Sequence, residues 1–411
     1  MITNVSSHFC FRPVGQGCFY VGNIHVSKDK NFKFVYDCGT NSNITYLKSE
    51  VDIYRNRLMN HLNMLVISHF DKDHVNGVVR LLKNVKCVRL VIPYYKTIER
   101  LLLYAITDST DEDYRNLLLD PIAYFRNEQF NIDEIIVIGA GDQDSTIDVL
   151  EGVPPERPLL RNLELSEEDS KLFDLYDSTN YSRNGSQHNK DTNFTFSLNS
   201  QYTFIKTPYH QRLGPGLWEF VFYLREIENK ILMNKFTSDV NILLKKHSIN
   251  LFELFEKPYI GKLKAIYRRY YGKKLNDTSL VMYHGPYFQY ANNVFMDSKK
   301  YLGFYSINYG TLLTGDIALN TENKIDRMRN YYGYIFDEIG LLQVPHHGSK
   351  YNWCFKHDNG LEEFFYVINH GLGGKHPYPE VINDITTNCI PDGLALNNEV
   401  NPFCYRIFCR S

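Results

Sequence analysis

The chain has 411 residues, of which 43% are hydrophobic and 22% are charged. This length predicts one large domain or two, and this composition excludes a globally disordered chain, a collagen-like fibre and a coiled coil. The 45 lysine and arginine residues are nearly balanced by 47 aspartate and glutamate residues, so the formal net charge is −2. Without a basic excess over the whole chain, a nucleic acid can be bound only through a local basic patch.

Eight cysteines are spread along the chain without a Cys-x-x-Cys pair. Disulfide scaffolds are short and dense in cysteine, so this spacing predicts reduced thiols in a cytoplasmic protein. Residues 1–8 show no basic region followed by an apolar run, which argues against a signal peptide. No apolar stretch of the sequence approaches the roughly 20 residues of a membrane span, so no membrane partner is expected.

The first part of the chain alternates between predicted strands and helices. Aromatic and β-branched runs, broken by glycine and asparagine, predict strands within residues 8–38. A helix is expected over residues 46–62 and a buried strand over Met64–Ser68. A short helix at Val75–Asn84 and a strand at Val88–Pro93 follow. This alternation is typical of a layered α/β fold.

The middle of the chain is richer in helical sequence. Helices are predicted at Ile98–Ile106 and Asp113–Phe125, with single strands at Glu134–Ile138 and Trp218–Leu224. Between these strands, a stretch rich in serine and asparagine near residues 178–193 predicts an exposed polar loop.

A helix-rich segment over residues 227–271 ends in a basic and aromatic cluster. Its tyrosines are Tyr267, Tyr270 and Tyr271. Cations follow the phosphates of a nucleic acid, while tyrosines stack on unpaired bases, so the cluster predicts nucleic-acid binding. A solvated helix face is the alternative. The cations are Lys262, Lys264, Arg268, Arg269, Lys273 and Lys274.

The strand-rich pattern returns after the basic cluster. Strands are predicted at Ser279–Tyr283, Gly310–Asp316, Ile339–Val344 and Phe364–Asn369. The sequence therefore predicts one α/β domain formed by residues 1–94 and 276–411. Residues 95–275 are expected to form a mostly helical insertion between these two halves.

The strongest chemical signal is His69-Phe-Asp-Lys-Asp-His74, directly after a predicted strand. Four side chains that can bind a metal lie within this short loop. Where the chain turns from a strand toward a helix, His69 with Asp71 and Asp73 with His74 can serve two adjacent ions. The alternative is a polar turn in which an aspartate caps the following helix.

Three weaker signals also follow predicted strand ends. Asp316 ends the segment Leu-Leu-Thr-Gly-Asp, and its two oxygens can bridge two cations. His346 and His347 begin a glycine-containing turn that also carries Lys350, and His376 is followed by proline. Each is an ordinary turn by itself. Together with the first loop they favour a single site at the strand ends of both halves.

In their order and setting these segments resemble the metallo-β-lactamase superfamily, most closely the soluble domain of ComEC-type DNA-uptake proteins and their stand-alone relatives. The resemblance implies an αββα sandwich with a two-metal site at one edge between the sheets. It covers residues 10–94 and 276–385. The matching segments are Val14–Gly17, Val35–Gly39, Ser68–Gly77, Asn276–Val281, Leu312–Asp316, Val344–Ser349 and Lys375–Val381.

The resemblance also implies a set of ligands. His69 and Asp71 would hold one ion, Asp73 and His74 would hold the other, and Asp316 would bridge the two.

One or both of His346 and His347 would complete the second site, and Asp37 would lie beneath the metal loop as a supporting residue. Asp71 stands where the superfamily usually has histidine, and Val91–Tyr95 offers no further histidine. The resulting oxygen-rich site favours Mn²⁺ or Mg²⁺, with Zn²⁺ as the alternative.

The expected reaction is attack of a metal-bridging hydroxide on phosphorus. Asp71 or Asp73 would orient the hydroxide. His346, Lys350 or His376 would stabilise the pentacoordinate phosphate or protonate the leaving oxygen. His376 is favoured, because proline holds its loop rigidly.

The leading hypothesis is thus a metal-dependent phosphodiesterase, most simply a nuclease acting on DNA or RNA. The second is a hydrolase of a small molecule such as a phosphoester, a cyclic nucleotide or a lactone. The third is a non-catalytic adaptor or sensor with a vestigial metal site, serving a protein partner in DNA uptake or defence. An open basic groove would favour the first hypothesis and a narrow apolar pocket the second.

Overall fold

Two β-sheets form the centre of the computed structural model. It describes residues 4–27, 30–95, 97–106, 111–140, 174–177, 182–183, 202–207, 209–213, 218–225, 230–249, 252–255, 257–271, 278–286, 294–297, 305–306, 308–355, 364–388 and 393–410. Within these residues the first sheet has 11 strands. In spatial order they are β14 (Tyr305–Ser306), β13 (Val294–Asp297), β19 (Phe403–Arg410), β1 (Asn4–Phe11), β2 (Tyr20–Ser27), β3 (Lys30–Tyr36), β4 (His61–Val66), β5 (Lys86–Pro93), β6 (Asn131–Gly139), β9 (Thr203–Lys206) and β8 (Ser182–Arg183).

The second sheet has eight strands among the described residues. Strands β15 to β18 run parallel to one another, while β12, β11, β10 and β7 pair antiparallel. In spatial order they are β18 (Leu394–Asn397), β17 (Phe365–Asn369), β16 (Ile339–Gln343), β15 (Gly310–Leu313), β12 (Val281–Pro286), β11 (Trp218–Tyr223), β10 (Tyr209–Leu213) and β7 (Asp174–Asp177).

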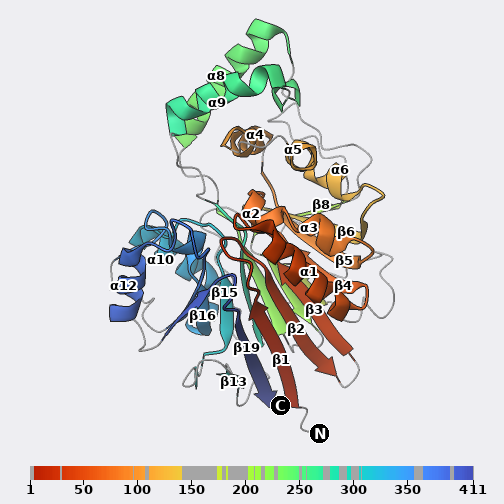
Figure 1. Cartoon of the computed structure of the whole chain (residues 1–411), viewed down its shortest axis with the longest axis vertical. Helices are drawn as coiled ribbons and strands as arrows, with labels where there is room; N and C mark the ends of the chain where they lie inside the picture. The colour runs from red at the N-terminus through yellow and green to blue at the C-terminus, as the bar shows by residue number, and fades with distance from the viewer. Residues whose placement is uncertain are drawn as a thin grey trace.

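Helices lie outside both sheets (Figure 1). On the first sheet, α1 to α3 cover the parallel strands. The helices α4, α5, α6, α8 and α9 lie beyond the end of the sheets that is nearest to α2 (Figure 1). On the second sheet, α10 to α12 cover the outer face. The bounds are α1 (Ile44–Leu58), α2 (Lys72–Val75), α3 (Val78–Leu82), α4 (Thr97–Ile106), α5 (Glu112–Leu119), α6 (Pro121–Phe125), α8 (Lys230–His247), η1 (Phe252–Phe255), α9 (Lys257–Tyr271), α10 (Glu322–Tyr332), α11 (Tyr334–Asp337), η3 (Pro345–Gly348) and α12 (Pro379–Asn388).

Three buried clusters hold these layers together. Between the sheets, side chains such as Phe34 and Met64 meet Met282 and Leu313. The other two clusters fill the space between each sheet and its helices. Strands buried on both faces are mostly hydrophobic, which is why β4 and β5 are apolar apart from His61, Asn63, Lys86 and Arg89. The predicted αββα sandwich is therefore confirmed.

The predicted elements of both halves are present, with two differences beyond small end shifts. The helix expected over residues 46–62 ends at Leu58, since β4 begins at His61, and the helix expected at Val75–Asn84 is two short helices, α2 and α3. The middle of the chain differs from the expected mostly helical insertion. Its helices α4 to α9 lie outside the sheets, but β6 and β9 extend the first sheet and β11, β10 and β7 extend the second. The reason is strand pairing. β6 pairs with β5 and β9 with β6 in the first sheet, while β11 pairs with β12 in the second, so each adds a strand to an existing sheet. Apart from β7 and β8, residues 141–201, and with them nearly all of the predicted polar loop, lie outside the described residues.

The expectation of reduced thiols throughout is wrong for one pair. Cys10 in β1 and Cys404 in β19 lie directly opposite each other in the antiparallel register and form a disulfide. The two residues are 394 positions apart in the sequence, so cysteine spacing could not reveal their proximity. Cys18, Cys38, Cys87 and Cys354 are free and buried. Among the described helices, none has the length and hydropathy needed to cross a membrane.

A buried ion pair joins β5 to β6. The Arg89 guanidinium lies 2.7–2.8 Å from the Glu134 carboxylate, and both side chains are almost fully buried. Removing one partner of such a pair leaves a buried charge without compensation, which costs about 3–5 kcal/mol. We therefore expect Glu134→Ala to lower the free energy of unfolding by that amount in urea titrations. Glu112→Ala, which removes an exposed carboxylate paired with Arg115, should leave the unfolding midpoint unchanged.

Candidate metal centre

Five strand ends meet at one edge of the sandwich. Strands β3, β4, β15, β16 and β17 all end here, and the residues that follow them carry the candidate ligands. The carboxyl ends of parallel strands share an edge of their sheet, so each connection starts from the same place. The Leu280 N–H donates to the Ser68 carbonyl over 2.7 Å, which ties the two sheets together at this edge.

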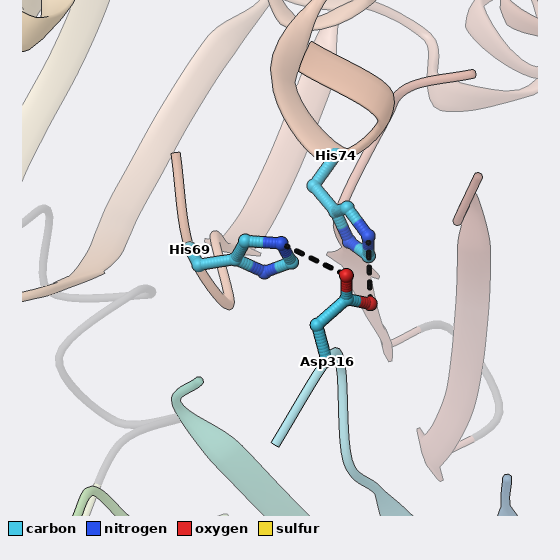
Figure 2. A group of neighbouring side chains, drawn as sticks. All are labelled: His69, His74 and Asp316. Atoms are coloured by element: carbon cyan, nitrogen blue, oxygen red, sulfur yellow. Dashed lines mark ion pairs between the residues drawn. The ribbon is translucent and has the colours of Figure 1, made fainter. Parts of the chain in front are cut away.

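The first group of ligand atoms consists of His69, His74 and Asp316 (Figure 2). His69 Nε2 lies 3.6 Å from Asp316 Oδ2, and His74 Nε2 lies 3.3 Å from Asp316 Oδ1. All three side chains are buried. These separations exceed the 2.7–2.9 Å or so of a strong charge-assisted hydrogen bond. They are close to the roughly 3.0–3.5 Å between two ligand atoms that bind one ion at about 2.1 Å each, the His69 distance being slightly longer.

The second group consists of Asp73, His74 and His347. Asp73 and His74 lie in α2, at the end of the metal loop (His69–His74). His347 lies in η3, which follows a strand of the second sheet. His347 Nε2 lies 3.2 Å from Asp73 Oδ2, and both side chains are buried. The two groups share His74, so they are adjacent.

The turn at η3 sends its two histidines in different directions. His346 and His347 both have positive φ, 48° and 57°, and Gly348 follows with 78°. Two consecutive non-glycine residues in the left-handed region are costly, and such backbone strain is concentrated at functional sites. His347 reaches Asp73, whereas His346 Nε2 lies 3.6 Å from Asp316 Oδ2. Asp316 thus presents one oxygen to His69 and His346 and the other to His74.

The outer nitrogens of the metal-loop histidines are held by a buried network. Asp37 Oδ2 accepts a hydrogen bond from His74 Nδ1 over 2.7 Å and another from the Ser68 hydroxyl over 2.6 Å. Because that hydroxyl donates to Asp37, its oxygen accepts from His69 Nδ1, 2.8 Å away. In the neutral form, both rings therefore carry their proton on Nδ1 and turn the Nε2 lone pair toward the site.

The η3 histidines are oriented in the same way. His346 Nδ1 donates to Asn352 Oδ1, and His347 Nδ1 donates to the Asn369 carbonyl, each over 3.0 Å. When neutral, all four rings consequently direct an Nε2 lone pair at a space edged by carboxylates, and His347 Nε2 lies within hydrogen-bond distance of Asp73 Oδ2, at 3.2 Å. The Nε2 atoms of His69 and His74 are buried and make no hydrogen bond. A buried set of inward lone pairs and carboxylates suits divalent cations and is unfavourable without them.

The close packing of these buried groups shifts the pKa values of His74 and Asp316. Burial by itself lowers the pKa of His74, but the carboxylates of Asp37 and Asp316 outweigh it and raise that pKa well above its usual value. Burial likewise raises the pKa of Asp316, yet His346, His74 and His69 bring it well below its usual value. The Asp316 carboxylate thus stays ionised and favours positive charge beside it.

Three predicted catalytic residues lie around this centre. Asp71 Oδ2 is 3.8 Å from His69 Nε2, and although Asp71 holds the N-cap position of α2 its side chain makes no capping hydrogen bond. The ring of His376 lies 5.7 Å from that of His346. Burial first, then His346 and His347, lower the pKa of His376 to about 4. Lys350 turns toward α12, where its ammonium lies 3.2 Å from Glu380 and over the Tyr378 ring.

The predicted nucleic-acid cluster is only partly exposed on α9. Arg268 and Arg269 are both exposed, and Arg269 pairs with Asp239 of α8 over 2.6 Å. Lys262 contacts His247 of α8 over 2.9 Å, and Lys264 is half-buried. Tyr267 is buried in the core, so it does not stack on bases as expected. Lys273 and Lys274 lie outside the described residues.

Sequence reasoning missed the residues that orient the ligands. Ser68, Ser279, Asn352 and Asn369 were not singled out, although Ser279 accepts from the Asp316 N–H over 2.9 Å and Asn352 holds His346. Ser68 immediately precedes the metal loop, which was a usable signal. The others are brought to the site by strand ends far apart in sequence.

Comparison with known proteins adds little to this geometry. No protein-family model matches the chain, and no curated protein matches it significantly. Among solved structures, the chain is similar to the crystal structure of a long form RNase Z from yeast, with 8% identity and a TM-score of 0.30. The alignment covers 89% of this chain and 37% of that one, so this chain spans little more than a third of that protein's length. A likeness of this degree defines neither a family nor an activity.

Proposed function

We propose that this chain is a two-metal phosphodiesterase of the metallo-β-lactamase type that cleaves nucleic acid. The observation that carries the proposal is the set of four imidazoles around Asp316, each held through Nδ1 so that Nε2 faces inward. Such outer hydrogen bonds fix ring orientation and raise ligand basicity, and a purely structural polar cluster does not need them. The sequence resemblance independently points to the same class.

Each oxygen of Asp316 defines one ion position. The first ion would be held by His69, Asp71, His346 and Asp316 Oδ2, and the second by Asp73, His74, His347 and Asp316 Oδ1. His346 therefore serves the first ion, although it was expected at the second. Imidazole nitrogens disfavour Mg²⁺, so we propose Mn²⁺, with Zn²⁺ as its competitor.

Two divalent ions held by these residues would polarise a phosphodiester and lower the pKa of a bound water. The chain's own residues supply the rest. Asp71 and Asp73 orient the attacking water. His376, beside His346 at the rim of the centre, is placed to exchange a proton with the leaving oxygen. Lys350 is held by Glu380 and stays a weaker candidate for contact with phosphate.

The direct test is hydrolysis by the purified protein after metal removal and defined reloading. Labelled single- and double-stranded DNA, RNA and bis(p-nitrophenyl) phosphate would be incubated with Mn²⁺, Zn²⁺, Mg²⁺ or EDTA. We expect cleavage of at least one nucleic acid with Mn²⁺ or Zn²⁺ and none with EDTA. Cleavage of the small diester alone would favour the small-molecule hydrolase, and no hydrolysis with two ions bound would contradict the proposal.

Arg268 offers a test of how nucleic acid is bound. It is exposed on α9, and no acidic partner is found for it among the described residues. If α9 guides the substrate, Arg268→Ala should raise KM several-fold with kcat nearly unchanged, because a remote phosphate contact stabilises substrate and transition state alike. The salt dependence of binding should become shallower by about one counterion. Lys83→Ala, which removes an exposed cation elsewhere, is the matched control. An unchanged KM and salt slope would mean that the exposed face of α9 is merely solvated.

A further inference from the structure

A second candidate binding site lies on the outer face of the first sheet. A cavity of about 460 Å³ is lined by β1, β2, β3 and β19 and by the last turns of α1. None of the candidate metal ligands lines it. A volume of this size is typical of sites for small organic molecules.

The lining of this cavity is strongly cationic. It includes Arg12, Lys33, Arg57 and Arg406, and no carboxylate residue. Arg12 is neutralised by Glu50, which is not part of the lining. Lys33 and Arg57 give the mouth of the cavity a local positive potential.

Two of these cations have no acidic partner among the described residues. The Lys33 ammonium lies 3.0 Å and 3.2 Å from the backbone carbonyls of Arg57 and Leu58, at the end of α1. Burial lowers the pKa of Lys33, as expected for an ammonium without a carboxylate beside it. The Arg57 side chain is exposed at the rim. Both are therefore able to engage an anion.

Buried polar atoms of the lining also lack partners. Arg12 Nε, Asn23 Oδ1 and the Tyr54 hydroxyl are shielded from solvent and make no hydrogen bond. Buried polar groups in native proteins are nearly always satisfied by protein, water or ligand. Three such atoms around one cavity indicate a place where a polar ligand completes the hydrogen bonding. The Tyr54 ring and Val21 supply an apolar wall for the rest of the molecule.

We propose that this cavity binds a phosphate monoester of nucleotide size. A guanidinium and an ammonium at one mouth match the charge and oxygen geometry of a phosphate dianion, for which arginine is especially suited. The apolar wall accepts the organic part, and the Tyr54 and Asn23 polar atoms fix its orientation. The proposal is independent of the reaction at the metal centre.

Calorimetric titration of the metal-loaded protein tests this proposal. The ligands are AMP as the probe, adenosine to remove the phosphate, and succinate as a dianion without phosphate. We expect AMP to bind at least tenfold more tightly than either of the others. Arg57→Glu should weaken AMP binding by more than tenfold and Arg57→Ala by about tenfold. Lys48→Glu, which reverses an exposed cation of the same helix outside the cavity, should change it less than twofold.

The metal centre could also bind a phosphate, and Asp316→Ala separates the two sites. AMP binding should persist in Asp316→Ala and disappear in Arg57→Glu, with circular dichroism showing that both variants are folded. The reverse pattern would assign AMP to the metal centre and overturn the proposal. Absence of AMP binding to the wild type, or equal binding of succinate, would overturn it as well.

Discussion

Replacing Asp316 by alanine is expected to remove both metal ions and nearly all hydrolytic activity. Its two oxygens face candidate ligands on both sides, His69 and His346 on one side and His74 on the other. Without this carboxylate each ion loses a ligand, and the shared charge that holds the pair together is gone. Loss of two-metal stabilisation of the transition state, about 4 kcal/mol, corresponds to a thousandfold fall in kcat.

The measurement combines metal content by mass spectrometry with kcat on the best substrate. Asp316→Ala should retain fewer than one ion per chain, whereas the wild type retains two. The control is Asp326→Ala, which removes an exposed carboxylate of α10 paired with Arg329. Two ions retained in Asp316→Ala together with kcat within threefold of the wild type would contradict the bridging role.

A subtler change at Asp37 should also have a large effect. Asp37 is fully buried and accepts three hydrogen bonds, from the Ser68 N–H, the Ser68 hydroxyl and His74 Nδ1. Asparagine has nearly the same shape, but its amide nitrogen donates rather than accepts. In Asp37→Asn the His74 ring is therefore expected to carry its proton on Nε2, where a metal ligand must have a lone pair.

We expect Asp37→Asn to weaken metal affinity by about 10- to 100-fold while the fold is preserved. Titration with a fluorescent metal indicator measures the affinity, and nitrogen NMR of the histidine rings reports the tautomer directly. Asp52→Asn alters an exposed carboxylate of α1 and should change neither quantity. An unchanged His74 tautomer with normal metal affinity would show that Asp37 is only a packing residue.

Local patterns in the sequence were sufficient for the fold class and for most elements of the two halves. Buried parallel strands are rich in apolar residues, so β4, β5 and β16 could be located largely from their hydrophobicity. The metal loop could be recognised because its four candidate ligands lie within the short segment His69–His74, directly after a strand. Short-range spacing of this kind is a property of the sequence itself.

The pairing of distant strands could not be read in this way. The two strands predicted within residues 95–275 were assigned to an insertion between the halves, yet β6 and β11 join the two sheets of the sandwich. Cys10 meets Cys404 only because β1 and β19 pair in one particular register. Hydrophobicity shows that a strand is buried but not which neighbour covers it.

The sequence by itself determined which side chains could bind metal. They are His69, Asp71, Asp73, His74, Asp316, His346 and His347. Only the tertiary structure decided how they are shared between two positions. His346 and His347 are adjacent in the chain, but left-handed backbone sends one toward Asp316 and the other toward Asp73. The hydrogen bonds that turn each Nε2 inward come from strand ends far apart in sequence. Residue type is local information, whereas ligand direction depends on backbone dihedrals and on neighbours that only folding brings together.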